Sequence, residues 1–180
     1  MSRNSTGGKF PSVVEVRLSA VRVDLASNTP VLLLQETDGL GRTLPIFIGA
    51  PEATAIAFSL QGVTPPRPMT HDLMRDLLEA LDAVLERVVI TELRSATYYA
   101  ELQLRRGQSR LTVSSRPSDA VALAVRTGCP LFVEDELMEA EGIVLPAEDE
   151  DEEGESTNPD ELVGQFREFL DTVRPEDFSS

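Results

Sequence analysis

Hydrophobic and polar residues alternate along several stretches in both halves of the chain. Alternation with a period of two is typical of strands, and glycine- or proline-containing turns separate most of these stretches. Asp38-Gly39-Leu40-Gly41, for example, has the composition of a hairpin turn. The expected strands are residues 13–18, 20–23, 31–35, 43–48, 88–93, 98–104, 110–114 and 131–133.

Other stretches repeat their apolar residues every three or four positions, which indicates helices. Prolines at 51 and 117 stand where helices begin, and glycines at 62 and 128 stand where they end. Thr70 is the expected N-cap of a further helix. The expected helices are residues 53–60, about 70–82 with Leu85 as the furthest extent, 120–126 and 135–141.

The two halves of the chain echo each other. Residues 44–53 resemble residues 111–120, because each segment is a strand that leads into a proline-started helix with an acid in its first turn. Glu52 aligns with Asp119 in this comparison. We therefore expect a duplicated unit, β-rich and then helical, whose halves pack into one compact α+β domain.

The ends of the chain differ in composition from its middle. Residues 1–11 are polar and are expected to form a disordered tail, followed by the domain at 12–145. Residues 146–158 are an acidic linker. Residues 159–174 predict an amphipathic C-terminal helix that docks on the body or on a partner. Its apolar stripe is Leu162, Phe166, Phe169, Leu170 and Val173.

The net charge of −15 is unevenly distributed. Residues 148–180 contribute −11, and residues 1–147 contribute only −4. Proteins that bind nucleic acid tightly usually carry a basic patch, so this mildly acidic body argues against nucleic-acid binding.

The sequence argues against several classes of protein. There is no apolar run of ~20 residues for a membrane span and no apolar segment for a signal peptide. Cys129 is the only cysteine, which excludes an intrachain disulfide and fits a reducing compartment. No Gly-x-Ser-x-Gly, phosphate-binding loop, dinucleotide-binding or zinc motif is present. We expect a cytoplasmic protein without a membrane partner.

The proline-rich loop before the second helix carries candidate catalytic residues. It contains His71, the only histidine, between Arg67 and Asp72. Histidine changes charge near neutral pH and can serve as a general base. We expect His71 and Asp72 to activate a water molecule.

The acids and arginines at the helix starts complete a candidate site. Glu52 and Asp119 are expected to hold a divalent metal, Mg²⁺ or Mn²⁺, through their oxygens. Arg67, Arg116 and Ser118 are expected to bind phosphate. Such a set of groups suits the hydrolysis of phosphodiesters.

Each of these residues also has a structural interpretation. Acids in the first turn of a helix favourably oppose its dipole, which would account for Glu52, Asp72 and Asp119 without any function. A lone histidine after a threonine, such as His71, is as often a structural hydrogen-bonding residue as a catalyst. Arg116 and Ser118 could simply tie loops together.

Three separated motifs resemble the bifunctional nuclease domain family. They are Leu44-Pro45-Ile46-Phe47-Ile48-Gly49 with Glu52-Ala53, Pro66-Arg67-Pro68-Met69-Thr70-His71-Asp72-Leu73, and Arg116-Pro117-Ser118-Asp119-Ala120-Val121-Ala122-Leu123-Ala124. The resemblance covers about residues 13–145, and the whole chain is similar to compact actinobacterial members. Phe47 replaces a frequent tryptophan, and Ser114-Ser115 replace a frequent acid.

The resemblance implies a nuclease, a bifunctional DNase and RNase, that would act on single-stranded RNA or DNA. It also implies a compact α+β fold and self-association into a homo-oligomer. Two alternatives remain. One is a non-catalytic module that binds a small anion or a protein, and the other is a self-assembling domain whose motifs serve turns and caps.

Overall fold

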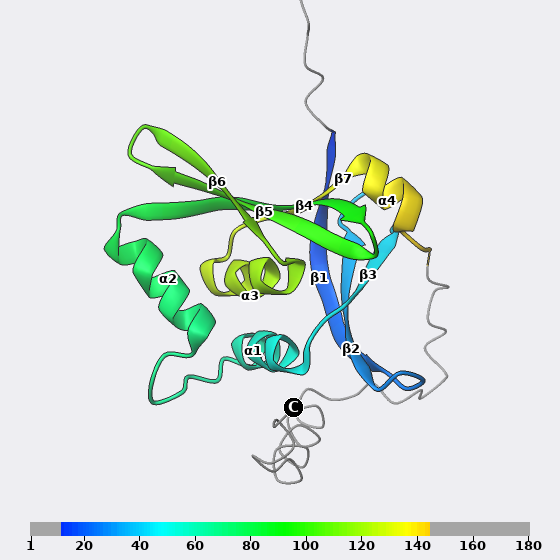
Figure 1. Ribbon diagram of the computed structural model, residues 1–180, viewed down its shortest axis with the longest axis horizontal. Helices are drawn as coiled ribbons and strands as arrows, with labels where there is room; N and C mark the ends of the chain where they lie inside the picture. Colours follow the sequence, from blue (N-terminus) through cyan, green and yellow to red (C-terminus); the bar gives the residue numbers. More distant parts are fainter. Residues whose placement is uncertain (1–11, 145–180) are drawn as a thin grey trace, which may run out of the picture.

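The computed structural model describes residues 12–144 as one seven-stranded mixed sheet with four helices (Figure 1), which confirms the α+β class. The strands are β1 (Val13–Asp24), β2 (Thr29–Glu36), β3 (Thr43–Phe47), β4 (Ala83–Arg94), β5 (Thr97–Arg106), β6 (Ser109–Ser115) and β7 (Leu131–Glu134). The helices are α1 (Ala50–Leu60), α2 (Thr70–Ala80), α3 (Pro117–Thr127) and α4 (Asp135–Glu141).

The sheet consists of two antiparallel three-stranded meanders joined by a short central strand. Its order is β3-β2-β1-β7-β4-β5-β6. β7 pairs antiparallel with β1 and parallel with β4. The first meander leads into α1 and the second leads into α3, as the sequence echo predicts, although duplication itself stays a prediction.

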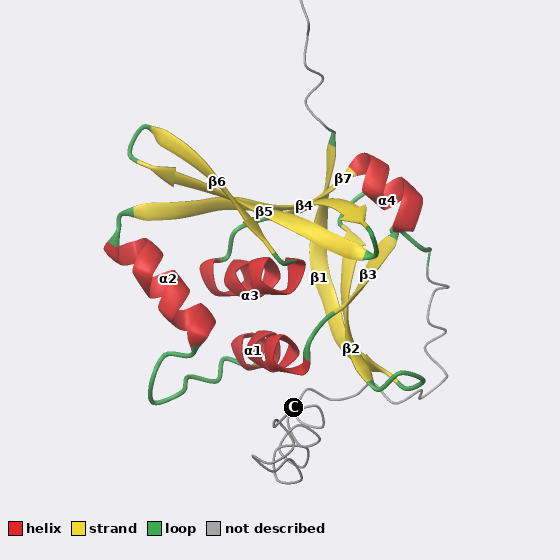
Figure 2. Ribbon diagram, in the orientation of Figure 1, coloured by secondary structure: helices red, strands yellow, loops and turns green. Residues whose placement is uncertain are grey.

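Three helices lie together on one side of the sheet. Figure 2 shows α1, α2 and α3 grouped beneath β4–β6, whereas α4 lies beside β7 and β3. α3 is central, because it packs against both α1 and α2 as well as β4 and β5. One apolar cluster fills the interior, and its fully buried members include Leu32, Leu34, Leu44, Ile56, Val88, Ile90, Val121 and Val133.

The first meander is more continuous than the sequence pattern predicts. The two expected strands at 13–18 and 20–23 form the single strand β1, in which the register shifts between Leu18 and Ala20. Such a bulge reverses the alternation of side chains, which explains the broken pattern. β2 begins at Thr29, two residues before the expected strand at 31–35, and Asn28 in the turn before it takes a left-handed conformation (φ 52°).

The ends of α2 also differ from expectation. Met69 is the N-cap instead of Thr70, because the Asp72 carboxylate accepts the Met69 N–H at 3.0 Å. The helix ends at Ala80, and Asp82 has a left-handed φ of 52°. Leu85 therefore lies in β4, opposite Leu104 of β5, rather than in the helix.

The expected tail at 1–11, acidic linker at 146–158 and C-terminal helix at 159–174 lie outside the described residues. Within residues 12–144, every helix is too short or too polar to cross a membrane.

Candidate functional site

Four of the expected site residues form one continuous chain of hydrogen bonds. His71 Nε2 lies 3.0 Å from Asp119 Oδ1. Arg116 donates from Nε to Asp119 Oδ2 and from Nη2 to Glu52 Oε1, both at 2.7 Å. We call these four residues the polar network.

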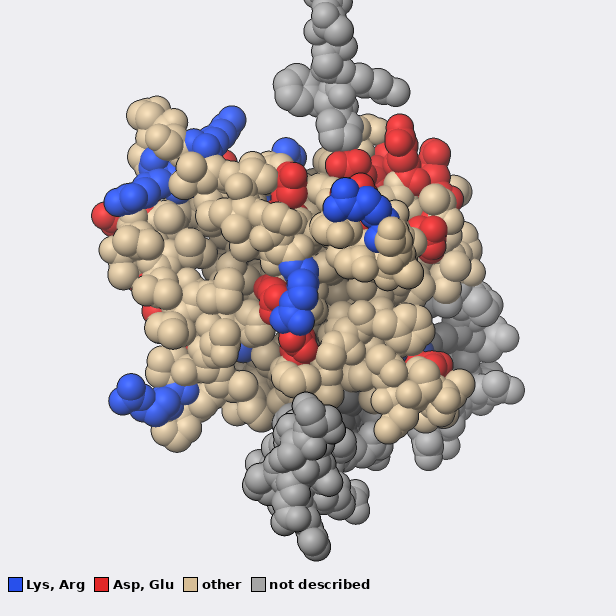
Figure 3. Space-filling view, viewed as in Figure 1, with Lys and Arg blue, Asp and Glu red and all other residues tan. Residues whose placement is uncertain are grey.

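The polar network forms where the starts of two helices meet. Glu52 lies in the first turn of α1 and Asp119 in the first turn of α3, and these helices pack side by side. Arg116, the N-cap of α3, lies between the two carboxylates. Figure 3 shows basic and acidic side chains interleaved in the middle of the face in view, over the ends of α1 and α3.

The polar network is buried at its His71 end and exposed to solvent at Arg116. His71 is buried, with 8% of its side chain exposed, whereas 66% of the Arg116 side chain is exposed. Burial tends to raise the pKa of Asp119, but hydrogen bonds from Arg116 and His71 outweigh it and lower that pKa below its ordinary value. Because ionised Asp119 can only accept, His71 Nε2 must be the donor.

Asp72 belongs to a different cluster from His71. Its carboxylate accepts from Arg126 Nε at 2.6 Å, and Arg126 also donates to the carbonyls of Ala122 and Ala55. Arg126 thereby ties α1, α2 and α3 together. The carboxylate partner of His71 is Asp119, 48 residues away in sequence.

The other two predicted phosphate ligands lie outside the polar network. Arg67 is exposed on the α1–α2 loop and makes no hydrogen bond or ion pair with another residue of 12–144. Ser118 follows Pro117 in the first turn of α3 and is buried, with 6% exposed. Of the seven expected residues, the structure gathers Glu52, His71, Arg116 and Asp119.

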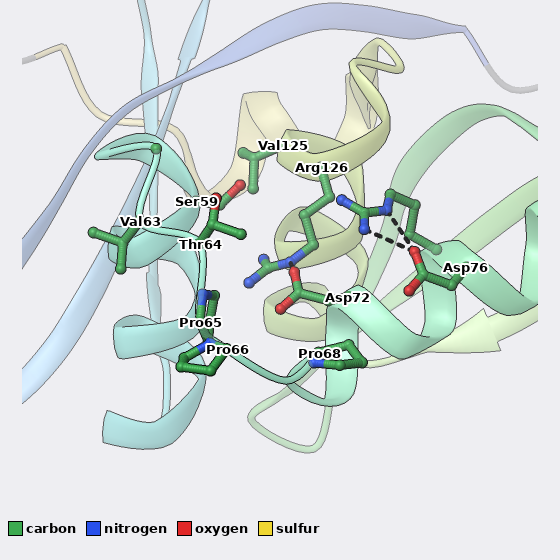
Figure 4. Close-up of a pocket in the computed structure, with 12 residues that line it drawn as sticks. Ser59, Val63, Thr64, Pro65, Pro66, Pro68, Asp72, Asp76, Val125 and Arg126 are labelled. Atoms are coloured by element: carbon green, nitrogen blue, oxygen red, sulfur yellow. Dashed lines mark hydrogen bonds and ion pairs between the residues drawn. The ribbon is translucent and has the colours of Figure 1, made fainter.

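The Asp72–Arg126 pair lines a hollow of about 400 Å³ between the α1–α2 loop, α2 and α3 (Figure 4). Prolines 65, 66 and 68 line the loop side. Arg75 and Asp76 of α2 also line it, and their charges are paired at 2.7 Å. The two cations of this hollow are thus each paired with a carboxylate.

The arrangement of Glu52 and Asp119 does not suit a divalent metal. The guanidinium of Arg116 lies between their carboxylates and bonds to both, so it supplies the positive charge that the pair would otherwise attract. Within residues 12–144, no three acid, histidine or cysteine side chains converge as metal ligands.

Sequence reasoning missed Arg126. An arginine in the last turn of a helix is ordinarily explained by the helix dipole, so its position in the sequence does not indicate a buried role. Its burial, with only 4% of the side chain exposed, follows from the packing of three helices. No local pattern signals this.

Comparison with known proteins agrees with the three motifs. A family model described as the bifunctional nuclease domain matches residues 32–146. An uncharacterized protein of Mycobacterium tuberculosis (strain H37Rv) is 48% identical over 166 residues, which cover 92% of this chain and 98% of that protein.

Plant proteins match more distantly. Bifunctional nuclease 1 of Oryza sativa subsp. indica is 29% identical over 105 residues, 57% of this chain and 32% of that protein. Bifunctional nuclease 1 of Arabidopsis thaliana is 27% identical over 117 residues, 63% of this chain and 36% of that protein. With the family model matching well over half of its length, the chain belongs to the bifunctional nuclease domain family.

Proposed function

We propose that this protein hydrolyses phosphodiester bonds in RNA or DNA and that the polar network is its catalytic site. One observation carries the proposal. In a member of the bifunctional nuclease domain family, a histidine, two carboxylates and an exposed arginine are joined by hydrogen bonds. These are the groups needed to move a proton and to hold a phosphate.

His71 is the general base in this proposal. With Nε2 donating to Asp119, the neutral imidazole keeps its lone pair on Nδ1, which can accept a proton from an attacking hydroxyl or water. Asp119 is a positioning residue, because it holds the tautomer and orientation of the ring. This assignment replaces the expected pairing of His71 with Asp72.

Arg116 binds the phosphate. Its Nε and Nη2 atoms hold the two carboxylates, while its Nη1 makes no hydrogen bond with another residue of 12–144. An exposed guanidinium can bind a phosphate oxygen and stabilise the charge that develops on it. Glu52 and Asp119 keep this guanidinium in a fixed position.

Metal dependence is a separate proposal. Glu52 and Asp119 could hold Mg²⁺ or Mn²⁺ only if Arg116 moved away from between them. The proposed roles of His71 and Arg116 do not need this movement. Activity that persists in EDTA would agree with these roles, whereas activity restored only by a metal would favour the rearranged site.

The test is cleavage of labelled single-stranded RNA and DNA by purified protein. We expect His71→Ala to lower kcat by ~10²–10⁴-fold, the usual contribution of a general base. Arg116→Gln should raise KM and lower kcat, and the variant should fold because the Arg116 side chain is exposed. Arg75→Gln is the matched control, because the ion pair that Arg75 makes within residues 12–144 is with its neighbour Asp76 on α2.

Two results would contradict this proposal. Equal cleavage by the wild type and by both site variants would mean that the activity comes from a contaminant. A wild type that binds a strand and never cleaves it would point to the binding module instead. Circular dichroism of each variant establishes that it is folded.

A further inference from the structure

The β5–β6 hairpin carries an excess of positive charge. Arg105 and Arg106 end β5, and Arg110 lies opposite Arg105 on β6. Glu86 is the carboxylate that pairs here, with Arg105 at 2.7 Å and with Arg110 at 3.6 Å. Arg106 is exposed and has no ion pair with another residue of 12–144. Three arginines therefore face one carboxylate.

The β5–β6 arginines form a cluster, whereas Arg67, the exposed arginine of the α1–α2 loop, is a single cation. The arginines at 42, 75, 116 and 126 are each held by a carboxylate. In Figure 3, basic side chains gather at the end of the molecule where Figure 1 places the β5–β6 hairpin. In a chain with a net charge of −15, such a local excess is where a polyanion is attracted most strongly.

β6 forms an open edge of the sheet. It pairs with β5 alone, and its first six residues are exposed. The edge strand of a sheet presents backbone N–H and C=O groups with no partner strand, and charged side chains discourage pairing with another sheet. Arg110, with 83% of its side chain exposed, stands on this edge.

A row of donors runs along β6 on the face of the sheet opposite α3, because the buried Leu102 and Leu104 of β5 pair with Val113 and Leu111 and not with this row. Side chains two apart in a strand share a face at intervals of ~6.8 Å, so Arg110, Thr112 and Ser114 form one row. Arg116 follows two residues later. Figure 1 shows β6 running from the hairpin to the start of α3. β6 thus leads from the basic hairpin to Arg116, which a nucleic-acid strand lying on this row reaches by passing over the sheet edge at the end of β6.

We propose that a single-stranded nucleic acid lies along the β6 edge, with its phosphates on Arg110, Thr112, Ser114 and Arg116 and its end on the hairpin arginines. This inference rests on the proposed function and names the path of its substrate. Single-strand sites combine a cationic track with side chains that follow the backbone. A duplex would need a wider basic surface than one edge strand provides.

The first experiment measures the salt dependence of binding to a short labelled RNA or DNA strand. Each phosphate contact contributes ~0.7 to the slope of log K against log salt for single strands. We therefore expect Arg106→Gln/Arg110→Gln to reduce the slope by ~1.4 and to raise KM, with kcat nearly unchanged. The control, Arg17→Gln/Arg94→Gln, removes the same charge from exposed arginines elsewhere on the sheet.

A second pair of variants tests the middle of the row. Thr112 is exposed, so both Thr112→Glu and Thr112→Gln should fold. The glutamate places a negative charge beside the phosphates, and we expect it to weaken binding by tenfold or more relative to the glutamine. Equal binding by these two variants would contradict the path.

The outcomes separate this inference from the proposed function. If the hairpin variant keeps the wild-type slope while His71→Ala still abolishes cleavage, the path is wrong and the nuclease stands. If the β6 variants change only the solution mass, the edge joins two copies of the chain, which also overturns the path. A wild type that neither binds nor cleaves a strand refutes both.

Discussion

At the scale of single residues, the Asp72–Arg126 pair shows how a buried charge is accommodated. Arg126 is almost fully buried, and its guanidinium meets one carboxylate and two carbonyl oxygens from three helices. A buried cation is tolerated only when its hydrogen bonds are satisfied in this way. The position of Asp72 therefore has a structural reason, independent of the catalytic role predicted for it.

Removing the charge of Asp72 should destabilise the fold. Asp72→Asn leaves Arg126 buried without a counter-charge, which costs about 3–5 kcal/mol. Denaturant unfolding near neutral pH measures this loss. Asp76→Asn is the control on the same helix, where an exposed pair contributes at most about 1 kcal/mol. Equal losses for the two variants would contradict the structural role of Asp72.

The same pair predicts a dependence on pH. Burial tends to raise the pKa of Asp72, but hydrogen bonds from Arg126 and the Met69 N–H outweigh it and lower that pKa below 3.8. A group whose pKa is lower in the folded state than in the unfolded state stabilises the protein at pH values above its unfolded-state pKa. This contribution disappears as the pH falls through the folded-state pKa. The stability difference between wild type and Asp72→Asn should therefore shrink below about pH 3.8.

At the scale of elements, the start of α1 depends on a close approach between a glycine and the polar network. Gly49 is the N-cap of α1, and a Cβ there would overlap Glu52 Oε2. The backbone at Gly49 is extended (φ −74°), so alanine suits its conformation. A larger residue at position 49 is therefore opposed by the Glu52 carboxylate, which occupies the space of its Cβ, and not by the backbone conformation.

We expect Gly49→Ala to leave the domain folded and to displace Glu52 from Arg116. Hydrogen bonds to charged groups contribute about 1.5–3 kcal/mol, so the loss in kcat/KM should be tenfold or more. The effect acts through Glu52, so adding Gly49→Ala to Glu52→Ala should cause no further loss. An additive loss in the double variant would show that Gly49 acts by another route.

At the scale of the whole molecule, β7 joins the two meanders. This four-residue strand lies between β1 and β4, and its Val133 is fully buried. Because β7 and one apolar cluster connect the two meanders, we expect the two meanders to unfold together.

Val133→Ala tests this cooperativity. The lost methyl groups and the remaining cavity should cost about 2 kcal/mol. Hydrogen exchange should then accelerate equally at Leu34 in β2 and at Leu102 in β5. Val113→Ala, on the exposed edge of β6, serves as the control with little expected effect. Faster exchange in one meander alone would show that the halves unfold separately.

The sequence pattern predicted most elements because each depends on nearby residues. Prolines and glycines marked the starts and ends of α1 and α3, and Gly128 does take the left-handed conformation that ends α3 (φ 69°). The boundary between α2 and β4 was missed. Leu85 continues the helical spacing of α2, but pairing with β5 draws it into the sheet.

Sequence reasoning placed Glu52 and Asp119 near each other, and the structure shows Arg116 joining them. It did not find the partner of His71. Adjacent residues on a helix point about 100° apart, so His71 and Asp72 face different neighbours. Those neighbours are Asp119 and Arg126, some 50 residues further along the chain.

The sequence by itself thus determined the α+β class, the helix starts and the residue types of the candidate site, because capping, turn formation and side-chain periodicity act between close neighbours. Only the tertiary structure decided which charges pair and which remain exposed. Arg116 joins two carboxylates because the packing of α1, α2 and α3 brings Glu52 and Asp119 together. The β5–β6 arginines share a single carboxylate, Glu86, because the order of the strands places them beside β4.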